Sequence, residues 1–435
     1  MSGPLWLQEV RSKKMNTSTR ALLSCPARTY LSLPLVVVFL CVAPAAAEPV
    51  GIEEILRAVS QTAEVEVARA RSGVAAAELD QARSGRLPNV TLDAQGDIAG
   101  EANAREPEYV LRVEQTLLDW GATDETIAGR RSTLVARQSA EAEALLDAAL
   151  TATEAFYSIA AINQKLEANS QSRESLRDLE DMMRRRVANN VSPQIELGEV
   201  VTRIDLLEIA AHGLGSERRR QQLVLERLTG TQVDEPVVGS CARETVSDEA
   251  ELIRSALEAS PTLARIRLEA EAYQSDAASL DASGRPTVVA GYRSDSDLDG
   301  GGFDQRAYLA LRYELQTGGE LGSRVAQARA RYIEQQALLR ESAETITQTV
   351  SSWASAYQTS LSLAGVYRRV VDSRTEQRAS HLRRFMVGRS SWRDVLNAHR
   401  EVTEARVAEI DSVTRTCLAL RSLELLSGGY DVGAR

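Results

Sequence analysis

Histidine is the side chain best suited to catalysis or metal binding at neutral pH, and this sequence has only three. His212, His381 and His399 lie in segments with helical spacing, with no cysteine or acid beside them at ligand spacing. No glycine-rich loop of the kind that cradles a phosphate is found. The sequence therefore predicts no enzyme, no cofactor and no resident metal ion.

One loop concentrates carboxylates and glycines. It runs from Asp295 to Asp304, contains Gly300-Gly301-Gly302, and also holds Asp297 and Asp299. Carboxylate oxygens are calcium ligands, so weak calcium binding is one interpretation. A flexible loop at the cell exterior is the favoured one, because connecting segments of this composition run over protein surfaces.

The four cysteines form no framework that the sequence reveals. Cys25 and Cys41 lie in the N-terminal segment, and Cys241 and Cys417 are far apart in the rest of the chain. Two remaining cysteines do not make a disulfide framework, even in an oxidising compartment. We therefore expect Cys241 and Cys417 to be ordinary small residues.

Residues 1–47 have the pattern of a secretory signal peptide. Arg20 and Arg28 precede an apolar run over 31–42, and three alanines at 45–47 offer a cleavage site after Ala47. The long upstream region leaves the start at Met1 or Met15. A lipoprotein signal with an acylated Cys41 is the alternative, but Leu40 stands where such signals carry a small residue.

The chain that remains is acidic. Without residues 1–47, 46 Lys and Arg oppose 60 Asp and Glu, a net charge of −14. Such a charge argues against nucleic acid as a partner. After Glu48, we find no apolar stretch long enough for a membrane-spanning helix.

The elements that position these residues are written twice at a fixed offset of 198 residues. Matching markers are two prolines, two glycines, a pair of turn residues, and the segments ending at Gly230 and Gly428. The first three pairs are Pro88 with Pro286, Gly121 with Gly319, and Asn190 with Gly388. A tandem duplication is the interpretation.

Each copy reads as helix, strand pair, long helix, turn and helix. The first helix is predicted at 52–84, and the two long helices at 122–188 and 320–386, uninterrupted by proline. The predicted division is 1–47 signal peptide; 48–230 first repeat with strands at 89–98 and 108–117 and a tip at 188–193; 231–247 linker; 248–428 second repeat with strands at 287–295 and 306–316 and a tip at 387–392; and 429–435 tail.

All four predicted strands alternate between an apolar and a polar face. Their length and pattern are typical of an outer-membrane barrel, and soluble hairpins are the alternative. The apolar, lipid-facing residues are Val90, Leu92, Leu111, Val113, Leu309, Leu311 and Tyr313. Four strands cannot close a barrel, so the chain must oligomerise, with two copies giving eight strands and three giving twelve.

Three segments resemble the TolC family of outer-membrane export channels. Ser84-Gly-Arg-Leu-Pro88 resembles the entry to the family's first strand, and Gln115-Thr-Leu-Leu-Asp-Trp-Gly121 resembles its hairpin exit. Phe385-Met-Val-Gly-Arg-Ser-Ser-Trp-Arg-Asp-Val-Leu-Asn397 resembles its second tip. The order of elements is similar over nearly the whole chain after the signal.

This resemblance implies a mainly α fold with membrane β structure: a homotrimer with one twelve-stranded outer-membrane barrel, continued by a periplasmic helical tunnel. The tips would contact a periplasmic adaptor, served by an inner-membrane ABC or proton-driven transporter, and the outer-membrane lipid would surround the barrel. Implied adaptor contacts are Val187, Asn190, Val191, Ser192, Val387, Gly388, Arg389, Ser390 and Trp392.

The resemblance also implies a gate one helical turn beyond the second tip. Asp394 matches an acid lining the aperture, Phe385 matches a position that links neighbouring helices, and Asn397 stands where a second acid is frequent. An N-terminal helix acid is the alternative role for Asp394. Packing inside the tip is the alternative for Phe385 and Trp392. Gly388 is expected to permit the turn.

Two cargo types and one other class of protein remain open. Residues 391–401 resemble the branch that secretes adhesins and other large proteins by the type I route, which we favour. Drug or metal efflux is the alternative. A soluble periplasmic coiled-coil adaptor is the alternative of another class.

Overall fold

The computed structural model describes residues 51–95, 108–239, 241, 248–297, 303–314 and 318–429. These belong to one compact unit, Ala47–Arg435. The predicted signal peptide, the calcium-loop residues at 298–302 and the tail beyond Gly429 lie outside the described residues.

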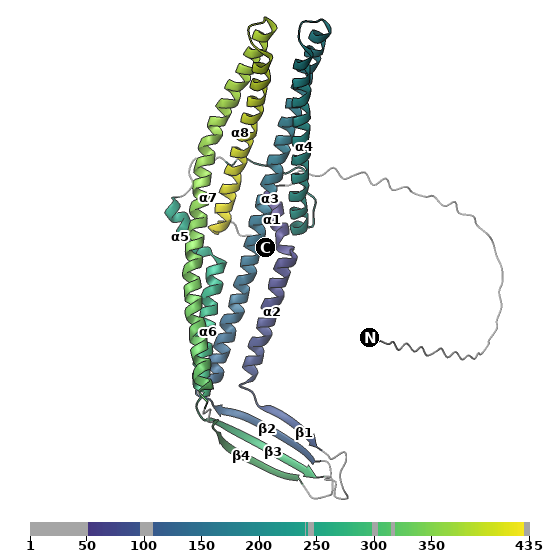
Figure 1. The fold of residues 1–435 in the computed structure, drawn as a ribbon. Coiled ribbons are helices and arrows are strands. Elements are labelled where there is room, and N and C mark those ends of the chain that lie inside the picture. The colour runs from purple at the N-terminus through teal and green to yellow at the C-terminus, as the bar shows by residue number, and fades with distance from the viewer. Residues whose placement is uncertain are drawn as a thin grey trace, which may run out of the picture. The chain divides into compact units, whose positions relative to one another are not determined.

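Two helices of equal length run along the unit. α3 (Ala122–Ala188) and α7 (Glu320–Met386) are 67 residues each, and both predicted ranges are confirmed. At about 1.5 Å per residue each rises roughly 100 Å. α4 (Gln194–Thr229) returns beside α3, and α8 (Trp392–Leu426) returns beside α7 (Figure 1). At one end of the unit, each long helix therefore forms a helical hairpin with its return helix.

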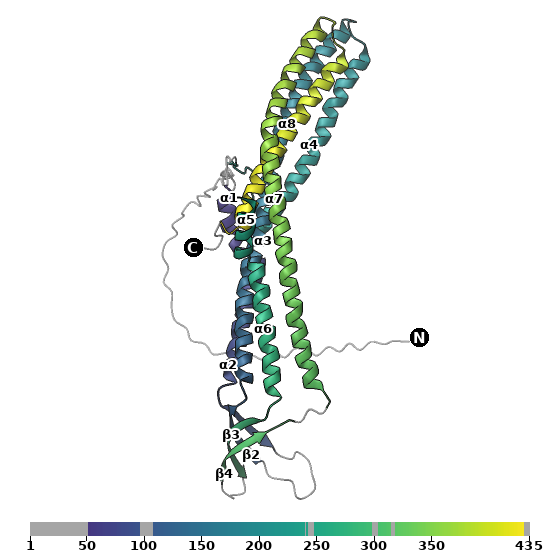
Figure 2. The ribbon, with the colours of Figure 1, turned by 90° about the vertical axis from the view of Figure 1, so that its left-hand side faces the viewer.

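The other half of each long helix packs against the first helix of a repeat. α2 (Ala63–Ser84) lies along α3, and α6 (Pro261–Ser283) lies between α3 and α7 (Figures 1 and 2). Short helices α1 (Ile52–Ala58) and α5 (Glu249–Ala259), with a turn of 3₁₀ helix at Val59–Gln61, sit near the middle.

The predicted single helix over 52–84 is wrong, because the chain breaks at Thr62. The Thr62 side chain accepts from the backbone N–H of Val65 and caps α2. Ser260 caps α6 in the same way and is followed by Pro261 at the first helical position. The two capping residues are 198 residues apart. Pro261, which starts a helix in the second repeat, therefore also indicates where the helix of the first repeat is interrupted.

Four strands form one antiparallel sheet in the order β1-β2-β3-β4. They are β1 (Asn89–Gln95), β2 (Glu108–Leu118), β3 (Thr287–Asp297) and β4 (Phe303–Arg312). β2 and β3, one from each repeat, pair in the middle. Tyr313 was expected inside the fourth strand, but β4 ends one residue before it.

The repeat is visible in the backbone as well as in the sequence. Gly121 and Gly319 both take a positive φ before the long helices, and so do Gly230 and Gly428 after the return helices. Asn190 and Gly388 take it at the two tips. Left-handed residues are uncommon, so three pairs at one offset show the same turn built twice.

The prediction for the cysteines is wrong: Cys241 and Cys417 form a disulfide, with their Cα atoms 5.0 Å apart. It fastens the linker to α8. The linker is also held on the first repeat, where Asn163 Nδ2 donates to the Asp234 carbonyl at 2.9 Å and Gln222 Nε2 to its carboxylate at 2.7 Å. Val233, fully buried, enters the largest core cluster with Phe156.

One described helix, α3, is long and apolar enough to cross a membrane by length and composition. This differs from the expectation drawn from the sequence. Of its most apolar window 61% is buried within the unit, so the test is weak support for a span. The buried residues are largely alanines packed in the core cluster around Phe156.

Candidate functional site

The two helical hairpins end in matching tight turns. Asn190 (φ 55°) turns the chain from α3 to α4, and Gly388 (φ 71°) turns it from α7 to α8. The positive φ expected of Gly388 is confirmed. Asparagine is the residue other than glycine that most readily takes this conformation. The tips therefore share one backbone geometry despite different side chains.

An aromatic pair joins the two hairpins below the tips. Phe385 and Trp392 lie with ring centroids 5.2 Å apart, and the guanidinium of Arg186 from α3 stacks 4.9 Å above the Phe385 ring. Trp392 Nε1 donates to the Glu196 carbonyl of α4 at 2.9 Å. The pair belongs to a core cluster with Met183.

Two roles were open for Trp392, an adaptor contact and packing inside the tip, and its burial favours packing. Only 3% of Trp392 is exposed, because its ring fills the space between the hairpins and its N–H is satisfied by α4. Of the implied adaptor contacts, the exposed ones are Asn190, Val191, Val387, Gly388 and Arg389. Val187, Ser192 and Ser390 are half-buried, and Arg186 Nε donates to Ser192 Oγ at 3.1 Å.

Asp394 closes a capping box at the start of α8. Its backbone N–H donates to Ser391 Oγ at 3.2 Å, and its carboxylate accepts from the Ser391 backbone N–H at 2.9 Å and from Ser390 Oγ at 3.0 Å. Hydrogen bonds from Ser391, then from Ser390, hold the pKa of Asp394 below its usual value. The Asp394 carboxylate is exposed and ionised. Both roles predicted for it, the helix cap and the acid lining the aperture, need this charge.

Asn397 and the three histidines do not form one cluster. Asn397 is exposed one turn beyond Asp394 on α8. His381 Nδ1 lies 3.2 Å from Ser390 Oγ, His399 is buried, and His212 is exposed on α4. Within the described ranges no group of three or more His, Cys, Asp or Glu is placed to hold a metal ion.

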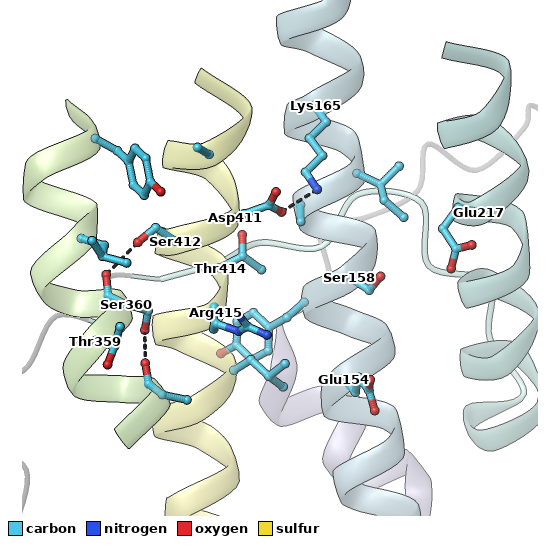
Figure 3. Close-up of a pocket in the computed structure, with 18 of the residues that line it drawn as sticks. Glu154, Ser158, Lys165, Glu217, Thr359, Ser360, Asp411, Ser412, Thr414 and Arg415 are labelled. Carbon is cyan, nitrogen blue, oxygen red and sulfur yellow. Dashed lines mark hydrogen bonds and ion pairs between the residues drawn. The ribbon is translucent and has the colours of Figure 1, made fainter. Parts of the chain in front are cut away.

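A groove separates the α3–α4 hairpin from the α7–α8 hairpin. It has a volume of about 1090 Å³ and lies between α3 and α4 on one side and α7 and α8 on the other (Figure 3). Lys165 Nζ of α3 reaches across to the Asp411 carboxylate of α8 at 2.5 Å. Ser172 of α3 and Thr403 of α8 share a further hydrogen bond at 2.9 Å. These polar contacts join the hairpins there together with a small buried apolar cluster of Ala161, Ala168 and Ile410.

The sheet has one apolar and one polar face, as its alternation predicted. On the apolar face Val90, Leu92, Leu309 and Leu311 each expose 61% or more of their surface. Leu111 and Val113 lie on the same face in the central strand β2, paired to Leu92 and Val90. Tyr313 is exposed just past the strand. A wide exposed apolar sheet is unusual in water and fits lipid contact.

The polar face carries an ordered ion-pair network that the sequence did not reveal. The register places Arg112, Arg293 and Arg306 directly opposite one another on β2, β3 and β4. Alternation predicts a polar face for each strand, but no sequence signal gives the register between the two repeats. The carboxylate of Asp295 pairs with Arg293 at 2.6 Å and with Arg306 at 2.9 Å.

These elements define a class: subunits with a membrane sheet at one end and paired helical hairpins at the other. The family model for outer membrane efflux proteins matches residues 55–231 and 252–429, once for each repeat. The chain belongs to the outer membrane efflux protein family. A comparison with curated protein sequences gives no significant match.

Solved structures of outer-membrane channels share the fold. VceC from Vibrio cholerae matches with a TM-score of 0.75 at 18% identity, covering 86% of this chain and 95% of VceC. A membrane protein from Pseudomonas aeruginosa matches at 0.77 and 17%, covering 87% and 92%. The open-state MtrE channel of Neisseria gonorrhoeae matches at 0.72 and 13%, covering 87% and 88%.

Family membership fixes the general role. The protein is an outer-membrane efflux channel whose helices extend into the periplasm, and it is not an enzyme. Channels of this family form trimers and act with periplasmic adaptors and inner-membrane transporters. The resemblance read from the sequence is thereby confirmed at the level of the family.

Proposed function

We propose that three copies of this chain form one twelve-stranded barrel and a continuous helical tunnel. The observation that carries the proposal is the sheet, in which β1 and β4 each pair on one side only within the described residues. Its apolar face is exposed, and its polar face carries the ion pairs. Copies joined edge to edge bury the open edges and enclose the polar face.

Extraction and electrophoresis test the assembly. A trimer of this kind sediments with outer membranes, requires detergent, and migrates more slowly before heating than after, when it runs as the monomer. A detergent-free soluble monomer would contradict the channel and support the periplasmic adaptor. The proposed signal peptide, cleaved after Ala47, predicts a mature N-terminus at Glu48, which N-terminal sequencing measures. The disulfide supports export, since such bonds persist in oxidising compartments.

We further propose that the aperture lies at Asp394 and Asn397, with Phe385 joining the hairpins behind it. The exposed tip residues Val191, Val387 and Arg389, with their neighbours at the two turns, are the proposed adaptor contacts. A ring of three Asp394 carboxylates would favour cations. Asp394→Ala should therefore weaken cation selectivity in a planar bilayer.

Loss of the helix cap must be separated from loss of the charge. Ser391→Ala removes the other half of the capping box, the bond from the Asp394 N–H to Ser391 Oγ, and retains the carboxylate, so it serves as the control. Equal selectivity in Asp394→Ala and wild-type channels would rule out the gate. Equal changes in Asp394→Ala and Ser391→Ala would assign the effect to the cap instead.

The cargo has two candidates with different support. Type I protein secretion, with an ABC transporter, is supported by residues 391–401, which resemble that branch. Drug or metal efflux, with a proton-driven transporter, is supported by the family model, which describes outer membrane efflux proteins. Deletion of the gene separates them: loss of a surface protein with unchanged drug and metal sensitivity supports secretion, and the reverse result supports efflux.

A further inference from the structure

Three arginines form a row across the polar face of the sheet. Arg112 is the direct cross-strand partner of Arg293, and Arg293 of Arg306. Directly opposed residues have Cβ atoms about 5 Å apart, and like charges there are destabilising. Three successive positive charges at one level therefore oppose folding of the sheet unless neighbouring groups offset them.

One carboxylate offsets two of the three. Asp295 pairs with Arg293 and with Arg306, and Asp304 approaches Arg306 at 3.6 Å. Arg112 makes no ion pair with a carboxylate within the part of the chain that the structure describes. The row therefore retains positive charge, concentrated on β2.

Glu114, two residues from Arg112 on β2, is held by side chains from β4. Glu114 accepts a hydrogen bond from Tyr308 Oη at 2.6 Å and lies 3.3 Å from Arg312 Nη2. Tyr308 reaches it from β4 by crossing β3 over Gly291, where a Cβ atom would stand 2.2 Å from the tyrosine ring. Tyr308 and Arg312 thus bind the Glu114 carboxylate on the β4 side, while Arg112 still attracts it from β2.

We propose that Arg112, Arg293 and Arg306 form an anion-selective band inside the barrel, contacted by anionic groups of the cargo. This inference rests on the proposed trimer, in which nine arginines would lie at one level. Rings of arginine favour anions in pores, and low-dielectric barrel walls strengthen the field. Arg112 is the principal contact, and Tyr308 is a positioning residue that holds Glu114 towards β4 and limits its pairing with Arg112.

Reversal potentials of the purified trimer in a planar bilayer test the band, with potassium chloride as the probe. The gradient is kept at low salt, because screening lengths shrink to about 10 Å at 0.1 M. Arg112→Gln should lower the chloride-to-potassium permeability ratio by about twofold, and the triple replacement of the row by Gln should lower it further. Arg112→Lys retains the charge and should retain the ratio.

Tyr308→Phe provides an independent arm. It removes the hydrogen bond to Glu114 and leaves every charge in place, so it should lower the same ratio by freeing Glu114 to approach Arg112. A purely structural role for Tyr308 would reduce the amount of trimer without shifting the reversal potential.

The outcomes separate the inference from the proposed function. Failure to obtain a conducting trimer would overturn both. A conducting trimer with the same reversal potential in wild type, Arg112→Gln and the triple variant would overturn the anion-selective band and leave the channel standing. An equal shift in Arg112→Gln and Arg112→Lys would also overturn it, since the charge would then not be the cause.

Discussion

At the scale of single residues, backbone conformation explains why the two tips differ in composition. The chain needs a positive φ at residue 190 and again at residue 388. Glycine takes it without strain, and asparagine takes it at modest cost. This requirement explains the residue at the centre of each turn and places no such demand on the exposed residues beside it.

Gly388→Ala should lower the stability of the trimer by about 1 kcal/mol per subunit, because alanine at a φ of 71° is strained. Asn190→Gly is the matched change at the other tip and should be neutral or slightly stabilising. Thermal unfolding of the two detergent-purified variants measures the difference. Equal midpoints for Gly388→Ala and wild type would contradict the backbone argument.

His399 makes stability depend on pH. Burial, assisted by Arg378, lowers its pKa from 6.5 to about 4, and its Nε2 is buried without a partner among the described residues. The unfolded chain thus takes up a proton between these values and the folded one does not. The stability present above pH 6.5 is lost as pH falls towards 4, by about 2 kcal/mol at pH 5.

His399→Leu should remove this part of the pH dependence. The variant and the wild type are compared by thermal unfolding at pH values between 7 and 5, and the gap between their slopes is the measurement. Parallel slopes would show that His399 binds protons equally in the folded and unfolded states, against the argument from burial.

At the scale of elements, the long helices were the most predictable part. Their apolar spacing is regular, no proline interrupts them, and both ends are marked by turn residues. The strands were predicted from alternation, but β4 ended earlier than its pattern because alternation continues past the last paired residue. Pairing between repeats could not be predicted, because nothing local in sequence encodes it.

The candidate site shows the same limit. Gly388 was predictable from the needs of a tight turn, whereas the burial of Trp392 depends on α4, which is distant in sequence. The disulfide was missed because two cysteines far apart carry no spacing signal. Their retention in an exported chain was the available hint, since paired cysteines are stable outside the cytoplasm.

Removing the disulfide should loosen the linker. The bond joins residues 176 apart, and replacement of Cys241 and Cys417 by serine should cost about 2–4 kcal/mol. A lower unfolding midpoint in the double variant, reproduced in wild type by a reducing agent, is the expected result. The reductant should not affect the double variant. An unchanged midpoint would mean that the noncovalent contacts at Asp234 suffice.

At the scale of the whole molecule, the sheet requires a membrane and the helices require water. The two faces of the sheet are distinguished by exposure and charge, so substitutions on them should have different effects. The apolar face exposes Leu309 and Leu311, whereas the opposite face carries the row of arginines Arg112, Arg293 and Arg306.

Leu311→Arg should reduce insertion, since an arginine facing lipid costs from about 0–1 kcal/mol near the interface to about 2–4 kcal/mol at mid-membrane, and Leu311 lies one residue from the end of β4. Leu311→Ala is the control, because it loses apolar area without adding charge. The yield of heat-modifiable trimer in outer-membrane fractions is the readout. Equal yields from the two variants would place Leu311 away from lipid.

The open edges of the sheet also bear on how the protein reaches its destination. A newly exported subunit carries an exposed apolar face and two strands, β1 and β4, whose outer backbone groups can hydrogen-bond to any extended chain. Such a subunit is an aggregation hazard until it meets two others. Its safe passage therefore depends on escort by a chaperone and on the rate of encounter, which rises steeply with the concentration of new subunits.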